Sequence, residues 1–172
     1  MEEQKTGCLV CGAPLEYLQS QIEMECTYCH KKFMSNARCV NGHFICDSCH
    51  EQMGLRVIED ICRHTDSKDP VAIMKKIILS PYIYMHGPEH HVLVGSALLA
   101  AYKNAGGELD LDAALEEMRN RGAQVPGGIC GLWGTCGAAV STGIFVSLIT
   151  GASPLSGKEW GLCNEMTSRS LG

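Results

Sequence analysis

Three Cys-x-x-Cys pairs in the first fifty residues have the types and spacing that best suit metal chemistry. Two residues between cysteines allow a tight turn to point both sulfurs at one tetrahedral ion. With one more cysteine and one histidine, these pairs supply eight soft ligands, namely Cys8, Cys11, Cys26, Cys29, Cys39, His43, Cys46 and Cys49. Eight ligands suffice for two four-coordinate ions, so the sequence predicts two structural zinc sites.

The eight ligands can be divided between two ions in two ways. In a sequential arrangement, the first two pairs hold one ion and the last four ligands hold the other. In a cross-brace, the first and third pairs share one ion, and the second and fourth pairs share the other. The sequential arrangement is favoured, because the separation of Cys8/Cys11 from Cys26/Cys29 matches a zinc ribbon and because a Cys/His pair usually comes second in a cross-brace. In either arrangement each ion has four protein ligands and no position for water, which is typical of structural zinc.

A second cysteine motif lies in residues 127–145, GGICGLWGTCGAAVSTGIF. Cys130 and Cys136 belong to its first part, residues 127–137, which we call the glycine–cysteine loop. Cys136 precedes an apolar, helix-like run, and the free N–H groups and dipole at a helix start favour a thiolate. The pattern therefore predicts a metal ligand, a redox thiol or a nucleophile. The alternative is that the glycines serve packing and the cysteines fill space.

Histidines gather in the stretch MHGPEHH, residues 85–91, just before another apolar helical pattern. A helix start disfavours protonation, so neutral His86, His90 and His91 could bind a metal or accept a proton. Glu89 is the natural general base or partner of such a ligand; the alternative is a surface acid that stabilises the helix dipole. We predict that this stretch faces the glycine–cysteine loop across a pocket. In that arrangement, His90 and Glu89 join Cys130 and Cys136 as catalytic candidates, and His86 and His91 are cofactor-binding candidates. His30 and His50 directly follow metal-ligand cysteines and are expected to be exposed.

Four cysteines remain after the zinc ligands are assigned: Cys62, Cys130, Cys136 and Cys163. Four is the number that holds an iron–sulfur cubane, and a helical domain can gather cysteines from distant positions. A cluster bound by these residues is one prediction. The alternative is that Cys62 and Cys163, which lie on apolar stripes, are small core residues.

The hydrophobic pattern changes from alternation to helical spacing near residue 48. Residues 15–24 alternate and suit a hairpin between the first two cysteine pairs. Helix-start signals follow at Asp69-Pro70, Gly87-Pro88-Glu89, Asp110 and Ser156. The sequence therefore predicts an α+β protein with a zinc-ribbon or treble-clef-like β module in residues 1–50. A mainly helical domain should occupy residues 51–172.

Composition excludes several classes of protein. With 45% apolar and 19% charged residues, the 172-residue chain can bury a core. Its net charge of −5 leaves no basic half to hold phosphates, so nucleic acid is not a favoured partner. The longest apolar run, Gly137 to Ala152, is shorter than the roughly 18 to 20 residues of a membrane span, and the acidic N-terminus is unlike a signal peptide. We expect a cytoplasmic protein without a membrane partner, whose eleven cysteines serve metal or redox chemistry rather than disulfides.

The cysteine-rich start, MHGPEHH and GGICGLWGTCGAAVSTGIF together resemble an uncharacterised family of anaerobic bacteria and archaea, known only as a domain of unknown function. The resemblance covers nearly the whole chain. It implies an anaerobe's cytoplasm and, because such domains accompany methyltransferases, a methyltransferase or redox protein as partner in methyl or sulfur metabolism. It brings no activity and no catalytic residues. CGAAVSTG is also similar to a segment of redox proteins whose CGCA motif and trailing cysteine pairs are absent from this sequence.

These observations favour a zinc-stabilised metalloprotein of anaerobic metabolism. Its helical domain would carry either a Cys/His site for a redox metal, iron–sulfur included, or a reactive thiol. Two alternatives stay open: a non-catalytic, zinc-dependent protein-interaction module, and a thiol-based carrier of sulfur or methyl groups. Whether the protein is an enzyme is not decided by the sequence. The small residues of its apolar helices could pack within one chain or between the chains of a homo-oligomer.

Overall fold

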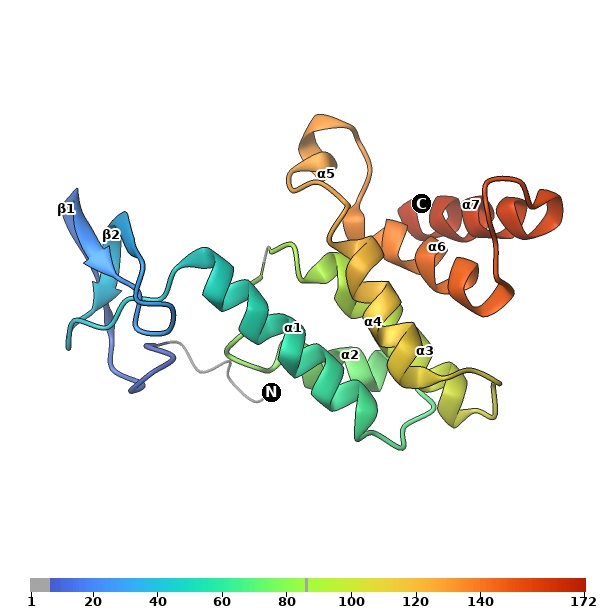
Figure 1. The fold of residues 1–172 in the computed structure, drawn as a ribbon, viewed down its shortest axis with the longest axis horizontal. Coiled ribbons are helices and arrows are strands. Elements are labelled where there is room, and N and C mark those ends of the chain that lie inside the picture. Colours follow the sequence, from blue (N-terminus) through green and yellow to red (C-terminus); the bar gives the residue numbers. More distant parts are fainter. Residues whose placement is uncertain (1–6, 86) are drawn as a thin grey trace.

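The computed structural model describes residues 7–85 and 87–172, with a small antiparallel sheet at the N-terminal end. This described part contains two strands followed by seven helices, which confirms the predicted α+β class. Figure 1 shows the sheet at one end of the molecule, with α1 (Asp47–Arg63) leading from it into the helices. His86 lies outside the described residues, so its role stays a prediction.

The sheet is a hairpin of β1 (Leu15–Glu25) and β2 (Lys32–Cys39). The prediction of a hairpin between the first two cysteine pairs is wrong, because residues 15–24 form one strand and its partner follows the second pair. Glu25 pairs with Lys32 next to the turn, and Leu15 pairs with Cys39 at the open end, with a register shift between Tyr17 and Ile22. Within the two strands only Met24 and Cys39 are buried. An isolated hairpin that buries so few side chains is only marginally stable in water, so other interactions must stabilise it.

Helix α1 belongs to both parts of the molecule. It starts directly after Cys46 and carries Cys49 in its first turn, while Leu55, Ile58 and Cys62 are buried farther along. This buried face packs against α2 (Pro70–Ile78), α3 (His90–Asn104) and α4 (Leu111–Gly122). Helix α1 therefore connects the hairpin to the helical core without a break.

The predicted start signals of α2 and α4 are confirmed by their caps. Asp69 accepts a hydrogen bond from the Val71 N–H at 2.8 Å, and Asp110 accepts one from the Ala113 N–H at 3.1 Å. Each bond satisfies a donor that the first helical turn leaves without a partner. Helix α2 ends at Ile78.

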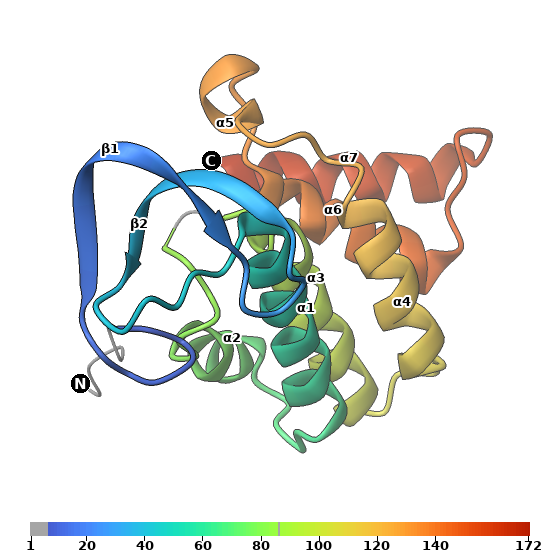
Figure 2. The ribbon, with the colours of Figure 1, turned by 60° about the vertical axis from the view of Figure 1, so that its left-hand side comes forward.

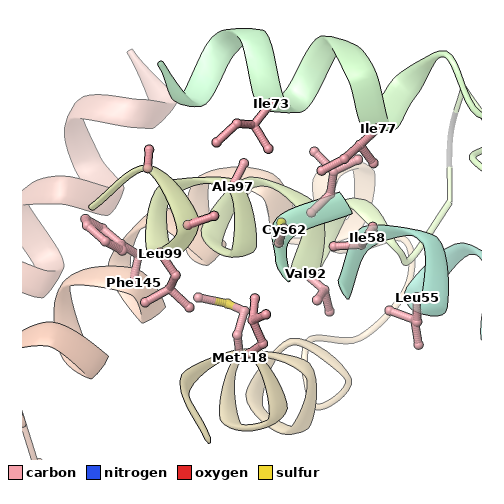
Figure 3. Close-up of a cluster of buried hydrophobic side chains, with 14 of the residues drawn as sticks. Leu55, Ile58, Cys62, Ile73, Ile77, Val92, Ala97, Leu99, Met118 and Phe145 are labelled. Carbon is pink, nitrogen blue, oxygen red and sulfur yellow. The ribbon is translucent and has the colours of Figure 1, made fainter. Parts of the chain in front are cut away.

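The core forms around α3, which packs against α1, α2, α4 and α6 (Gly137–Thr150). Figure 3 shows side chains from these helices meeting there, among them Ile58, Ile73 and Leu99, each no more than 1% exposed. Burying one such side chain contributes about 1.5–3 kcal/mol. Gly95 allows α4 and α6 to approach, because a Cβ there would overlap Met118 of α4 and the Ser141 hydroxyl of α6. The Gly95 N–H donates to that hydroxyl at 2.8 Å.

The chain after α4 forms the short α5 (Ile129–Leu132), α6 and α7 (Gly157–Leu171). Figures 1 and 2 both show the loop with α5 standing away from the other helices, while α7 lies along α6. Ser156 is the N-cap residue of α7, as its start signal predicted, but its hydroxyl does not cap the helix and instead accepts from the Ser153 N–H at 3.1 Å. Across the described residues, every helix is too short or too polar to cross a membrane.

Candidate metal centres and thiol site

The eight predicted metal ligands form two groups of four in which all ligand atoms lie within 4.8 Å of one another. One group is Cys8, Cys11, Cys39 and His43, and the other is Cys26, Cys29, Cys46 and Cys49. The first ligand pair thus joins the third, and the second joins the fourth. This is the cross-brace, so the favoured sequential arrangement is wrong.

The hairpin explains the cross-brace. Because Leu15 pairs with Cys39, the turn of Cys8 and Cys11, which precedes β1, meets the residues that follow β2. The Val40 N–H donates to the Pro14 carbonyl at 3.1 Å. The second cysteine pair, Cys26 and Cys29, lies in the turn at the other end of the hairpin. There the Thr27 N–H donates to the Phe44 carbonyl at 2.8 Å, which brings the start of α1 to the turn.

The distances between ligand atoms fit a tetrahedral ion. A Zn–S distance near 2.3 Å places two sulfurs about 3.8 Å apart in a tetrahedron. Cys29 and Cys46 have their Sγ atoms 3.8 Å apart, and Cys11 and Cys39 have theirs 3.5 Å apart. The Cys8 Sγ lies 3.7 Å from the His43 Nδ1. These donor sets are positioned to bind metal ions, and soft thiolates in this geometry suit Zn²⁺.

Backbone N–H groups surround the sulfurs. The donors are Val10 to Cys8 at 3.4 Å, Asn41 to Cys39 at 3.3 Å and Cys46 to Cys26 at 3.4 Å. Tight turns make these contacts, and left-handed φ angles of 73° at Gly12 and 84° at Gly42 help to form two of them. Such bonds stabilise thiolate charge and orient the ligands before an ion binds.

The thiols of each group have pKa values pushed in opposite directions. Hydrogen bonds from the Ala13 backbone and the Asn41 side chain lower the pKa of Cys11 to about 6. Burial and the neighbouring Cys46 and Cys29 thiols raise the pKa of Cys49 to about 12. The three thiolates of the first group and the four of the second lie close enough to repel one another, and a bound cation removes that repulsion.

His50 is buried, at 2% exposure, so the prediction of an exposed neighbour is wrong for this residue. It shares the inner face of α1 with Gly54 and Ile58, and its ring stacks on Tyr84 at 3.5 Å with 5° between the planes. Its Nε2 atom has no hydrogen-bond partner among the described residues. His30, in contrast, is exposed and pairs with Glu25 at 2.9 Å.

Glu89 and His90 hold the segment that precedes α3. The Glu89 side chain is only 1% exposed and accepts a hydrogen bond from the Tyr84 N–H at 2.9 Å, so it is not a surface acid. The His90 Nε2 bonds to the Tyr84 carbonyl at 2.7 Å. These contacts give both side chains a local positioning role, and neither is directed to the glycine–cysteine loop by any of them.

His91 does reach the glycine–cysteine loop. Its Nδ1 donates to the Val125 carbonyl at 3.1 Å, and its ring lies so close to Gly137 that a Cβ there would overlap it. Because a carbonyl only accepts, the neutral ring carries its proton on Nδ1 and a lone pair on Nε2. The two motifs therefore approach each other as expected, through the contact of His91 with Gly137, the residue after Cys136.

The four remaining cysteines are found in different surroundings. Cys130 and Cys136 are exposed, and Cys136 is the N-cap residue of α6. Cys62 is 1% exposed in the core, and burial raises its pKa to about 12. The half-buried Cys163 lies on α7, where its carbonyl approaches Gly143 of α6. Among the described residues, no group of ligand atoms within 4.8 Å of one another includes any of the four, and the burial of Cys62 sets it apart from the exposed pair.

The fold and the two ligand sets define a small metal-binding protein in which a cross-braced cysteine module is joined to a helical domain. The chain belongs to a family of unknown function, DUF5714, whose model matches residues 58–172. The match confirms the family resemblance over the helical part and begins after the last metal ligand. Comparison with curated proteins and with solved structures gives no match.

Sequence reasoning missed the stacked pair of His50 and Tyr84. One signal could have revealed His50: it precedes Gly54 and Ile58 at intervals of four residues, which places it on the buried stripe of α1. No comparable signal exists for Tyr84, because it lies in an irregular segment.

Proposed function

We propose that the protein is a zinc-stabilised thiol protein, in which two zinc ions order the N-terminal module and Cys136 is a reactive nucleophile. The observation that carries this proposal is the packing of His91 on Gly137, directly after Cys136. The hydrogen bond to the Val125 carbonyl leaves the lone pair of Nε2 as the basic atom of that ring.

The chemistry follows from a helix start beside a neutral imidazole. The first N–H groups of α6 favour negative charge at its N-cap residue, and the Nε2 of His91 can accept the thiol proton. The Cys136 sulfur is exposed and makes no capping hydrogen bond, so an electrophile can approach it. Cys130 is a second exposed thiol in the same loop and could receive a group from the first.

Reactive-thiol chemistry is better supported than an iron–sulfur cluster. A cluster held by the four remaining cysteines would need Cys62, whose thiol is enclosed by core residues, together with two cysteines at the surface. A thiol carrier of sulfur or methyl groups needs only the exposed pair. The anaerobic setting and a methyltransferase or redox partner stay predictions of the family resemblance.

Alkylation with iodoacetamide tests the proposal. His91 accepts the thiol proton of Cys136. The sulfur–carbon bond then forms as the carbon–iodine bond breaks, and iodide leaves with the electron pair. We expect Cys136 to react at pH 7 at least ten times faster than free glutathione, and His91→Gln to remove most of that advantage. Peptide mass spectrometry follows each cysteine separately. If Cys136 and glutathione were alkylated at equal rates, and His91→Gln left the rate of Cys136 unchanged, Cys136 would not be a reactive nucleophile.

A second candidate function is a zinc-dependent protein-interaction module. The observation that favours it is the exposure of Leu132 (80%) and Trp133 (69%) between the two loop cysteines. Large apolar side chains at a projecting loop are typical of contact residues in protein interfaces. Under this alternative, Trp133→Ala would abolish capture of a partner, whereas Cys136→Ser would leave it unchanged.

A further inference from the structure

A cavity of about 460 Å³ lies between the cysteine module and the helical part. Its walls include Tyr17 and Ala37 from the hairpin, His50 from α1, and Ile83 and Tyr84 from the segment between α2 and α3. Figures 1 and 2 show that segment, in light green, passing beside the hairpin end of α1. The volume is in the range of pockets that bind small molecules or cofactors.

The wall of this cavity includes a buried polar group that lacks a partner. The Nε2 of His50 has no hydrogen bond among the described residues, although its side chain is almost fully enclosed. Buried nitrogen atoms are nearly always hydrogen-bonded, because an unmade bond leaves the full cost of dehydration. A ligand that offers one hydrogen bond at this point would remove that cost.

Most of the wall is apolar or aromatic, with Tyr17, Phe44, Ile83 and Tyr84 as its larger members. The one arginine in the wall, Arg38, already bonds to Glu16 at 2.7 Å, so its charge is balanced. The exposed carboxylate of Asp47 also lines the cavity and would repel an anion. The parallel rings of His50 and Tyr84 provide a stacked pair at the wall. These features suit a flat, uncharged ligand better than an anion.

We propose that this cavity binds a planar, uncharged ring compound carrying one hydrogen-bonding group for the imidazole of His50. The site is separate from the thiol at α6 and does not depend on its reactivity. Because the hairpin forms one wall, the cavity exists only while the cysteine module is ordered. Ligand binding and metal binding should therefore strengthen each other.

Quinolin-2-one is a suitable probe, because its N–H and carbonyl on adjacent atoms can satisfy either tautomer of His50. We expect a titration of the ¹⁵N-labelled, zinc-loaded full chain to give saturable NMR shifts at Ala37, Ile83 and Tyr84. Intermolecular NOEs to the Ile83 methyl groups should place the probe without any substitution. Absence of saturable shifts at these residues, or of the NOEs, would overturn the proposal.

Two variants test the roles of the walls. His50→Phe keeps a ring to stack on Tyr84 but removes the nitrogen, so the affinity should fall about tenfold. Ala37→Trp should fill the cavity and abolish binding. Leu155→Trp, at a residue that is 97% exposed and outside the cavity, is the control and should bind the probe normally. Unchanged affinity in both wall variants would overturn the assignment.

Discussion

The imidazole of His91 lies against the Cα of Gly137 in the first turn of α6. This contact joins the central helix α3 to the glycine–cysteine loop, and the hydrogen bond from Nδ1 to the Val125 carbonyl fixes the plane of the ring. His90, the preceding residue, points instead to the Tyr84 carbonyl. Successive residues of a helix project about 100° apart, so only one of the two histidines can face α6.

Gly137→Ala should displace His91, because the added methyl group would overlap the ring. We expect a loss of about 1–3 kcal/mol in the free energy of unfolding, as for other overpacked sites, and slower alkylation of Cys136. Urea denaturation and peptide mass spectrometry measure the two effects. Gly161→Ala is the matched control: nothing lies within 4 Å of its Cβ position in α7, so it should stabilise by about 0.5–1 kcal/mol. Unaltered stability and alkylation in Gly137→Ala would contradict the contact.

The cross-brace can be tested by counting zinc in double variants. Cys8 and Cys39 belong to one ligand group, whereas Cys26 belongs to the other. The Cys8→Ser/Cys39→Ser variant should therefore keep one zinc per chain, and Cys8→Ser/Cys26→Ser should keep none. Native mass spectrometry measures the number of ions bound. The reverse result would indicate the sequential arrangement.

Local signals account for what the sequence predicted correctly. The spacing of the eight metal ligands and the acids at Asp69 and Asp110 act within a few residues, so they can be interpreted without the fold. The partition of the ligands could not be interpreted in this way, because it depends on the pairing of Leu15 with Cys39 across the hairpin. The burial of His50 likewise depends on Tyr84, which only the tertiary structure brings to it.

Cys62 should behave as a core residue rather than a ligand. Its folded-state pKa is raised by burial to about 12, so it should resist iodoacetamide at pH 8 until the protein unfolds. A raised thiol pKa also means that stability is complete below the ordinary pKa, near 9, and falls as the pH rises toward 12. In that window, wild-type protein should lose up to about 1.4 kcal/mol per pH unit more than Cys62→Ala. Urea denaturation between pH 8 and 10.5 measures the difference. Identical slopes, or rapid labelling of Cys62 in the native protein, would place this thiol outside the core.

Met118→Ala should be among the most destabilising single substitutions in the helical part. The side chain is fully buried, and its sulfur and terminal methyl group occupy the space that Gly95 leaves open in α3. The Ser141 hydroxyl also lies 3.8 Å from this sulfur, so α3, α4 and α6 meet at one side chain. Removing it leaves a cavity that three helices border, and we expect a loss of about 2–5 kcal/mol.

Leu155→Ala is the control for that substitution, because Leu155 is 97% exposed in the loop before α7 and its truncation should change stability by less than about 0.5 kcal/mol. Both variants are compared with wild type by urea denaturation of the zinc-loaded protein. The zinc content of Met118→Ala should stay the same, because the ligands lie in the hairpin and at the start of α1, away from this contact. A loss of zinc in step with the loss of stability would mean that the cysteine module and the helices unfold as one cooperative unit. A loss of stability without loss of zinc would mean that the module keeps its ions while the helical core opens.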